Sequence, residues 1–371
     1  MRAIVIGGGY AGLATVITLR QILPEVKIHV LDPREHHLKL THLHQTLQHP
    51  LSDYCIPFAL LARQFDFTHH QVALSFEQQN LEDWQWYKTV SLPDGTLPFD
   101  WLVIATGARP RLLPAGEVVY NQDAFCKQGG QEIIQNFLAR PENRERHITV
   151  VGAGATGLQF LFELDCLLKS QRLQYHLRLI NKSEKILPRL PGGFHDYIAE
   201  RLTRAGIDYL PHTRYLGQHG EAINLENTQT GEHYSLPSGL TLLFPGVHPH
   251  PHQFKVNRYG QVVVGKYTLP DIFAAGDCSH FSSSGLNTLT AQAAVRKGKQ
   301  IATNIKRIRQ GRLPYIYAYA ELGYFVSLGP LDGIGWLFFK NNILTGIPAF
   351  VIKEAVETQY DLFVEGLDLY F

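Results

Sequence analysis

Residues 2–19 read RAIVIGGGYAGLATVITL, and this stretch decides the fold. An apolar run with the length of a short buried strand leads into glycines, and apolar residues at helical spacing follow them. Gly7, Gly9 and Gly12 therefore form a G-x-G-x-x-G turn between a strand and a helix. In such a turn the first glycine permits the bend, the second lets the backbone approach a pyrophosphate, and the third lets helix and strand pack closely. The helix N-terminus adds free N–H groups, so the pattern predicts an anion-binding loop.

An acidic residue stands at the matching position after this loop. The next predicted strand, residues 27–31, ends at Asp32, which gives the ~20-residue separation that dinucleotide-binding folds use. A carboxylate there accepts hydrogen bonds from the ribose hydroxyls of an adenosine. The loop and the acid together predict a dinucleotide site, in preference to a purely structural glycine turn.

The same pattern recurs at residues 147–160, which read HITVVGAGATGLQF. Gly152, Gly154 and Gly157 take the three glycine positions, so a second dinucleotide site is predicted. The strand that follows ends at Asn181 instead of an acid, and two lysines come shortly after it. Because an acid would repel the 2′-phosphate of NADPH, Asn181 predicts that NADPH is accepted at least as readily as NADH. The alternative is that Asn181 hydrogen-bonds the ribose of NADH and that both lysines are solvated.

Further segments read as buried strands that end in turns of small residues. Such turns are places where the backbone comes close to a ligand, and one of these turns contains an aspartate. In an open α/β sheet, ligands bind at the carboxyl ends of the strands. The turn residues predicted to approach a cofactor in this way are Thr106, Gly107, Gly246, Gly276 and Asp277.

Composition and charge narrow the class of protein. The 371 residues suit two domains and a tail. The 34 Lys and Arg balance 33 Asp and Glu to a formal charge of +1, so no nucleic-acid partner is predicted. The first strand begins without a secretory segment before it, and the apolar stretches near the end fall short of the ~20 residues of a spanning helix. A cytoplasmic protein is predicted, with peripheral contact to the cytoplasmic face of a membrane as an option.

At this point the sequence resembles a known family. The two glycine loops, Asp32, the turn at 105–107, the turn at 275–277 and the segment TAQAA at 290–294 occur in the order and approximate spacing of the FAD-dependent pyridine nucleotide (disulfide) oxidoreductases. Within that family the chain looks most like the type II NAD(P)H:quinone oxidoreductases. The resemblance implies an α/β fold with two Rossmann-like domains, one for FAD and one for NADH or NADPH.

The reaction that the resemblance implies is hydride transfer from NAD(P)H to FAD, followed by transfer of two electrons to a quinone. One alternative is a flavoprotein with a different electron acceptor. Another is a flavin-binding signalling module whose partner affinity responds to nucleotide.

The resemblance also implies residue roles. Gly7, Gly9, Gly12 and Asp32 would hold the FAD adenosine and pyrophosphate, Arg34 would lie over the adenosine, and Asp277 would bind the ribityl or phosphate portion. Ala291 and Gln292 would open a helix that faces the isoalloxazine ring. The chain departs from the family pattern at Gln159, where the family has a glutamate, and at Arg296 and Lys297. The candidate catalytic residues are therefore Gln292, Ala291 and Gln159.

Cysteine and histidine patterns predict no metal site. The four cysteines have no close pairing, so free thiols are expected, without a zinc site or a local redox dithiol. Histidines cluster at 36–44, but no carboxylate or cysteine completes a helical ligand pair. His42 and His44 are either packed or solvated side chains, or one of them donates a proton near the flavin or a bound quinone.

The order of motifs predicts discontinuous domains. Residues 1–112 and 248–312 would form the FAD domain, and residues 113–247 the inserted NAD(P)H domain. Pro110, Pro114 and the cluster Pro249-His250-Pro251 mark the crossings.

Residues 313–371 would form an aromatic-rich tail. This tail either caps the flavin domain or presents an exposed patch to a membrane or to a second copy of the chain, as in a homodimer. Lys340 and Lys353 lie beside its apolar residues and are predicted to sit at lipid headgroups in the membrane alternative.

Overall fold

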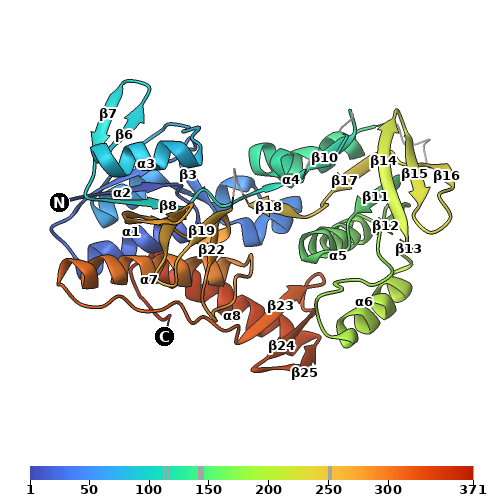
Figure 1. Ribbon diagram of the computed structural model, residues 1–371. Helices are drawn as coiled ribbons and strands as arrows, with labels where there is room; N and C mark the ends of the chain where they lie inside the picture. The colour runs from blue at the N-terminus through green and yellow to red at the C-terminus, as the bar shows by residue number, and fades with distance from the viewer. Residues whose placement is uncertain (112, 115–116, 141–145, 250–252, 371) are drawn as a thin grey trace.

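The computed structural model describes residues 1–111, 113–114, 117–140, 146–249 and 253–370. The chain forms two bodies, each built on a sheet whose central strands are parallel. The C-terminal elements run along one side of both bodies (Figure 1). The central strands of both sheets are short, apolar and almost fully buried, as expected for parallel sheets covered by helices.

The first body contains an eight-stranded sheet in the order β22-β19-β20-β21-β8-β1-β2-β5. Its strands come from the segments before and after the predicted insertion of residues 113–247. The two segments join where β21 pairs in parallel with β8. The strands are β1 (Arg2–Ile6), β2 (Lys27–Leu31), β5 (Phe67–His70), β8 (Trp101–Ile104), β19 (Phe254–Val256), β20 (Gln261–Val264), β21 (Tyr267–Ala274) and β22 (Ser279–Phe281). The helices of this body are α1 (Tyr10–Ile22), α2 (Phe58–Phe65), α3 (Gln78–Tyr87) and α7 (Ala291–Arg309).

A close helix contact joins the early and late segments of this body. Helix α7 packs along α1. The contact depends on Gly298, because a Cβ there would lie 2.3 Å from the carbonyl oxygen of Ala11. Thr15 donates a hydrogen bond from Oγ1 to the carbonyl of Gly298 at 3.3 Å. The first glycine loop and the start of α7 are therefore held by one helix pair.

The second body contains a five-stranded sheet in the order β10-β17-β11-β12-β13, with every neighbouring pair parallel. Its strands are β10 (Val119–Asn121), β11 (His147–Val151), β12 (His176–Ile180), β13 (Asp208–Leu210) and β17 (Leu240–Leu243). The helices are α4 (Gln122–Leu138), α5 (Ala155–Ser170) and α6 (Gly192–Ala205). An antiparallel sheet of β14 (Thr213–His219), β15 (Ala222–Asn227) and β16 (His233–Pro237) is appended.

Smaller elements complete the chain. The two crossings between the bodies pair as an antiparallel ribbon of β9 (Ala108–Pro110) and β18 (Val247–Pro249). His250 and Pro251 of the predicted crossing lie outside the described residues. The other small elements are β3 (His36–Leu38), β4 (Cys55–Pro57), β6 (Thr89–Leu92), β7 (Gly95–Pro98) and the 3₁₀ segments η1 (Leu40–Leu47), η2 (Leu51–Tyr54) and η3 (Gly276–Cys278).

The C-terminal elements join the two bodies. They are β23 (Gly323–Ser327), β24 (Gly333–Leu337), β25 (Phe339–Thr345) and α8 (Ile347–Val364), shown in orange and red in Figure 1. Ile334 and Trp336 of β24 are buried in the core of the second body. Tyr360 and Phe363 of α8 are buried in the core of the first. The segment predicted as a tail is thus structural and spans both cores.

Candidate functional site

The three glycines of the first loop have different surroundings. Gly7 has φ +104°, and a Cβ there would lie 2.3 Å from the carbonyl oxygen of Ala105. A Cβ on Gly12 would lie 1.8 Å from the carbonyl oxygen of Gly7. A Cβ on Gly9, in contrast, meets no atom within 4 Å. Gly7 and Gly12 are therefore required by the fold, whereas Gly9 keeps space open beside the helix start.

The second loop repeats this arrangement. A Cβ on Gly152 would lie 2.3 Å from the carbonyl oxygen of Phe244, and one on Gly157 would lie 2.0 Å from that of Gly152. Gly154 again meets nothing within 4 Å. Both loops thus rest on the carbonyl at the end of a neighbouring strand, and both keep their middle glycine open.

One cavity of about 940 Å³ connects the two bodies. Among the described residues, its lining includes many of those predicted from the sequence: Gly7, Gly9, Asp32, Arg34, Thr106, Gly107, Gln159, Gly276, Asp277, Ala291 and Gln292. Ala155 and Thr156, at the start of α5, also face it. The lining does not include Gly12, Gly152, Gly154, Gly157, Asn181 or Gly246. The first body therefore supplies most of the wall, and the second contributes the beginning of α5.

Asp32 is held at one end of this cavity. Its carboxylate accepts hydrogen bonds from the backbone N–H of Gly8 at 2.7 Å and of Arg34 at 2.9 Å. The Arg34 guanidinium adds two contacts, at 3.0 and 2.8 Å. Burial raises the pKa of Asp32, but these hydrogen bonds and the Arg34 charge outweigh it and lower that pKa. The carboxylate is thus ionised, and Arg34 lies against it; the sequence did not reveal this pairing.

Asp277 lies in the same lining and is partly exposed. Burial raises its pKa to about 6, against an opposing effect of the Lys297 charge. Lys297 is buried on α7 and donates hydrogen bonds to the carbonyls of Gly276 at 3.1 Å and Ser279 at 2.9 Å. Burial lowers the pKa of Lys297 to about 8, although Asp277 acts in the other direction. A buried ammonium thus braces the turn that carries Asp277.

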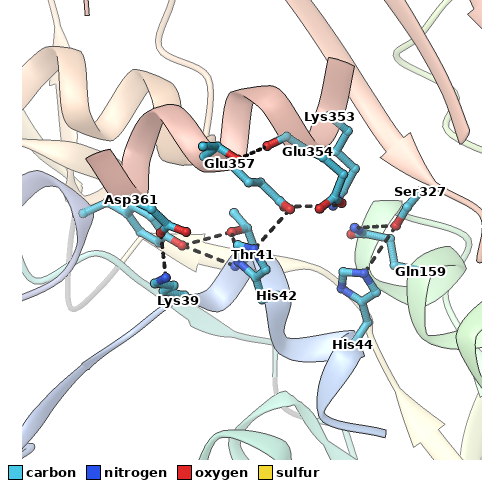
Figure 2. A network of polar contacts seen from close by, with 12 residues as sticks. Lys39, Thr41, His42, His44, Gln159, Ser327, Lys353, Glu354, Glu357 and Asp361 are labelled. Carbon is cyan, nitrogen blue, oxygen red and sulfur yellow. Dashed lines mark hydrogen bonds and ion pairs between the residues drawn. The ribbon is translucent and has the colours of Figure 1, made fainter. Parts of the chain in front are cut away.

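The predicted catalytic positions Gln159, Ala291 and Gln292 all line this cavity. Thr290 caps α7 by accepting a hydrogen bond from the N–H of Ala293, which leaves Ala291 and Gln292 at the cavity wall. From the other body, Gln159 Nε2 lies 3.4 Å from Ser327 Oγ. Ser327 Oγ lies 3.3 Å from His44 Nε2, as Figure 2 shows. Burial lowers the pKa of His44 to about 3, so its imidazole is neutral.

Helix α8 supplies two side chains that the sequence analysis missed as site residues. Lys353 and Glu357 line the cavity and form an ion pair at 2.8 Å (Figure 2). The prediction that Lys353 sits at lipid headgroups is wrong, because the residue is only 6% exposed. Its i,i+4 spacing to Glu357 was the available signal for an intrahelical pair. Lys340, in contrast, is exposed.

Each of two Rossmann-like sheets is followed by a glycine loop and a helix, and the first loop and the start of α5 line one cavity. This arrangement defines the class as an oxidoreductase with two dinucleotide-binding folds. The chain belongs to the pyridine nucleotide-disulphide oxidoreductase family, whose sequence profile matches residues 1–298. The predicted family and the predicted α/β fold class with two such domains are confirmed.

Relatives within the family are similar over nearly their whole length. The type II NADH:quinone oxidoreductase of Staphylococcus aureus (strain NCTC 8325 / PS 47) is 25% identical over 406 positions, which cover 100% of this chain and 97% of that protein. The sulfide:quinone oxidoreductase of Aquifex aeolicus superposes with a TM-score of 0.80 at 18% identity, covering 99% of this chain and 92% of that one. The NDH2 of Plasmodium falciparum, solved with NADH, superposes with a TM-score of 0.79 at 14% identity, covering 97% of this chain and 94% of that one. These matches confirm the predicted resemblance to type II enzymes.

Proposed function

We propose that the protein is an FAD-dependent NAD(P)H:quinone oxidoreductase. The observation that carries this proposal is that one cavity is lined both by the start of α7, at Ala291 and Gln292, and by the start of α5, at Thr156 and Gln159. A flavin ring at the first position would be within reach of a nicotinamide held by the second loop. The relative from Staphylococcus aureus is a type II NADH:quinone oxidoreductase, which supports a quinone as the acceptor.

The proposed cofactor site follows from the open middle glycine and the two acids. Gly9 leaves room for a pyrophosphate at the N-terminus of α1, and Asp32 offers an ionised carboxylate for a ribose. Asp277 lies in the wall between that end and α7, which suits contact with ribityl hydroxyls. Thr106, Gly107 and Gly276 would allow close approach of the backbone. The FAD domain would be residues 1–112 and 248–312.

The nucleotide site is proposed at the second loop. Gly154 would face the pyrophosphate of NAD(P)H, with Gly152 and Gly157 shaping the turn. Asn181 and Gly246 would lie along the rest of the nucleotide within the inserted domain of residues 113–247. The flavin supplies the hydride chemistry, and the chain supplies position and electrostatics. At α7, free N–H groups at the helix N-terminus would stabilise negative charge on the reduced ring.

Anaerobic mixing with NADH or NADPH tests the function. We expect rapid bleaching of the flavin and rapid reoxidation by members of a panel of benzoquinones and naphthoquinones. Persistence of the reduced protein with every quinone would favour the signalling module. Sulfide-dependent chemistry has weaker support, because no cysteine of the described chain lines the cavity.

Nucleotide preference gives a prediction at Asn181. Its side-chain amide donates to the carbonyls of Ser183 at 2.9 Å and Lys185 at 3.2 Å, so it supports the turn that presents two exposed lysines, Lys182 and Lys185. A charge-assisted contact of one lysine with a 2′-phosphate contributes ~1 to 3 kcal/mol, so we expect kcat/KM for NADPH to equal or exceed that for NADH. Asn181→Glu should shift the ratio at least about tenfold toward NADH. A wild type that prefers NADH more than tenfold, or a ratio unchanged in the variant, contradicts this.

Peripheral membrane contact is proposed at the β24–β25 turn and α8. Phe338 and Phe339 are 63% and 75% exposed, and Ile347 and Val351 of α8 are also exposed. No helix among the described residues is long and apolar enough to cross a bilayer. Dimerisation through the same surface is the alternative, and sedimentation at increasing protein concentration would reveal it.

Replacing both phenylalanines, Phe338→Ser with Phe339→Ser, should reduce sedimentation with liposomes by about tenfold or more, because each ring contributes ~1.5 to 3 kcal/mol when buried. Trp86 is 82% exposed and belongs to α3, a helix that lies away from β25 (Figure 1), so Trp86→Ser is the matched control. Equal binding by the wild type and the double variant would exclude this surface.

A further inference from the structure

Helix α8 and segment η1 form a continuous polar chain along the cavity wall (Figure 2). Glu357 lines the cavity, and its Oε2 lies 3.2 Å from His42 Nε2. The other imidazole nitrogen of His42 lies 3.1 Å from Thr41 Oγ1. Thr41 in turn lies 3.1 Å from the hydroxyl of Tyr10. An imidazole therefore stands directly behind a carboxylate that faces the site.

Surrounding contacts fix this pair. Lys39 at the start of η1 pairs with Asp361, one turn beyond Glu357, at 2.6 Å. The His42 ring stacks on Tyr54 with centroids 5.6 Å apart. The side chains of His42 and Glu357 are 13% and 10% exposed, so the imidazole retains a narrow access to solvent.

The groups around Glu357 favour its carboxylate form. Burial raises the pKa of Glu357, but the hydrogen bond from His42 and the Lys353 charge outweigh it and lower that pKa. His44 is neutral, and Gln159 has no proton to release at neutral pH. Among the described groups in this part of the wall, the pair of Glu357 and His42 has the chemistry of a general acid that solvent can recharge.

We propose that Glu357 relays to a bound quinone the proton that quinone reduction consumes. Its carboxylate takes this proton from His42 and passes it to a quinone oxygen, and His42 takes up another proton from solvent. This inference rests on the proposed function. Hydroquinone formation breaks the two C=O π bonds and forms two O–H bonds. The hydride equivalent from the reduced cofactor brings two electrons and one proton, and Glu357 brings the other proton. The overall balance is NAD(P)H + H⁺ + quinone giving NAD(P)⁺ + hydroquinone.

The experiment compares acceptors that differ in their need for a proton. The FAD-loaded full-length protein is reduced with one equivalent of NADH or NADPH and then mixed with 1,4-benzoquinone or with ferricyanide, which takes up electrons only. We expect Glu357→Gln to slow reoxidation by benzoquinone about 10² fold, the lower end of general acid catalysis, and to leave the ferricyanide rate within about twofold. His42→Ala should behave likewise, and added imidazole should restore its benzoquinone rate.

Glu354→Gln is the matched control. Glu354 lies on the same helix, contacts Lys353 at 3.7 Å and has a side chain 41% exposed. Its variant should keep both rates. Equal rates with benzoquinone in wild type and Glu357→Gln, equal slowing with both acceptors, or no rescue by imidazole would each overturn the proposal. A wild type that reduces no quinone would instead refute the proposed function.

Discussion

A valine at Gly9 is expected to abolish FAD binding while the protein stays folded. Gly9 has φ −79° and ψ −167°, extended backbone that valine readily adopts, and the space around its Cβ position is empty. The new side chain would therefore project into the cavity without disturbing the protein. We expect the flavin content of Gly9→Val to fall below about a tenth of the wild-type value, measured by absorbance after purification.

Gly12→Val provides the contrast. Its Cβ would lie 1.8 Å from the Gly7 carbonyl oxygen, so α1 would have to shift, at a cost of ~3 kcal/mol or more. This variant should lose stability as well as flavin, as seen in circular dichroism melts. Normal flavin content in Gly9→Val would show that the pyrophosphate does not lie at this loop.

Asp277→Asn is expected to lose flavin and yet to give an apoprotein at least as stable as the wild-type apoprotein at pH 7.5. The amide occupies the same volume but cannot accept hydrogen bonds through two anionic oxygens. Without the carboxylate, we expect flavin content below about a tenth of the wild-type value. Full flavin occupancy in the variant would exclude Asp277 from the cofactor site.

The stability expectation follows from the raised pKa of Asp277. A folded-state pKa of about 6, against an ordinary value of 3.8, means that the protonated carboxyl favours the folded state below pH 3.8. This contribution disappears as pH rises through about 6, so at pH 7.5 the ionised group costs up to ~3 kcal/mol. This cost already includes the attraction between Asp277 and Lys297, which lowers the pKa of Asp277. Melting temperatures of the two apoproteins at pH 5 and pH 7.5 test this expectation. The melting temperature of the variant should rise relative to that of the wild type as pH increases.

The sequence predicted the parts of the site that depend on local backbone geometry. Glycine positions, strand ends and the start of α7 follow from short-range spacing, and the cavity lining contains Gly9, Asp277 and Gln292. These features are local, because a strand, a turn and a helix N-terminus lie within a dozen residues or so.

The remaining parts depend on contacts between distant segments. The approach of Glu357 to His42 requires α8 to dock on η1, and nothing in either segment alone specifies that docking. Lys353 lies among apolar residues in the sequence, as a lysine at a membrane surface would, and only the fold shows that it is buried. The Arg34–Asp32 pair depends on which way a long side chain turns, a choice that residue spacing does not fix.

The packing of α7 on α1 sets an order of assembly during synthesis. The second body forms its whole five-stranded sheet from residues 119–243, so this sheet can form before β24 adds Ile334 and Trp336 to the core around it. The first body lacks β21 and α7 at that stage, and α1 has no partner for the surface that meets Gly298. The cofactor site at the first glycine loop is therefore incomplete on the nascent chain until β21 and α7 have been synthesised. In this order of assembly, flavin insertion is a late event that follows formation of the second sheet.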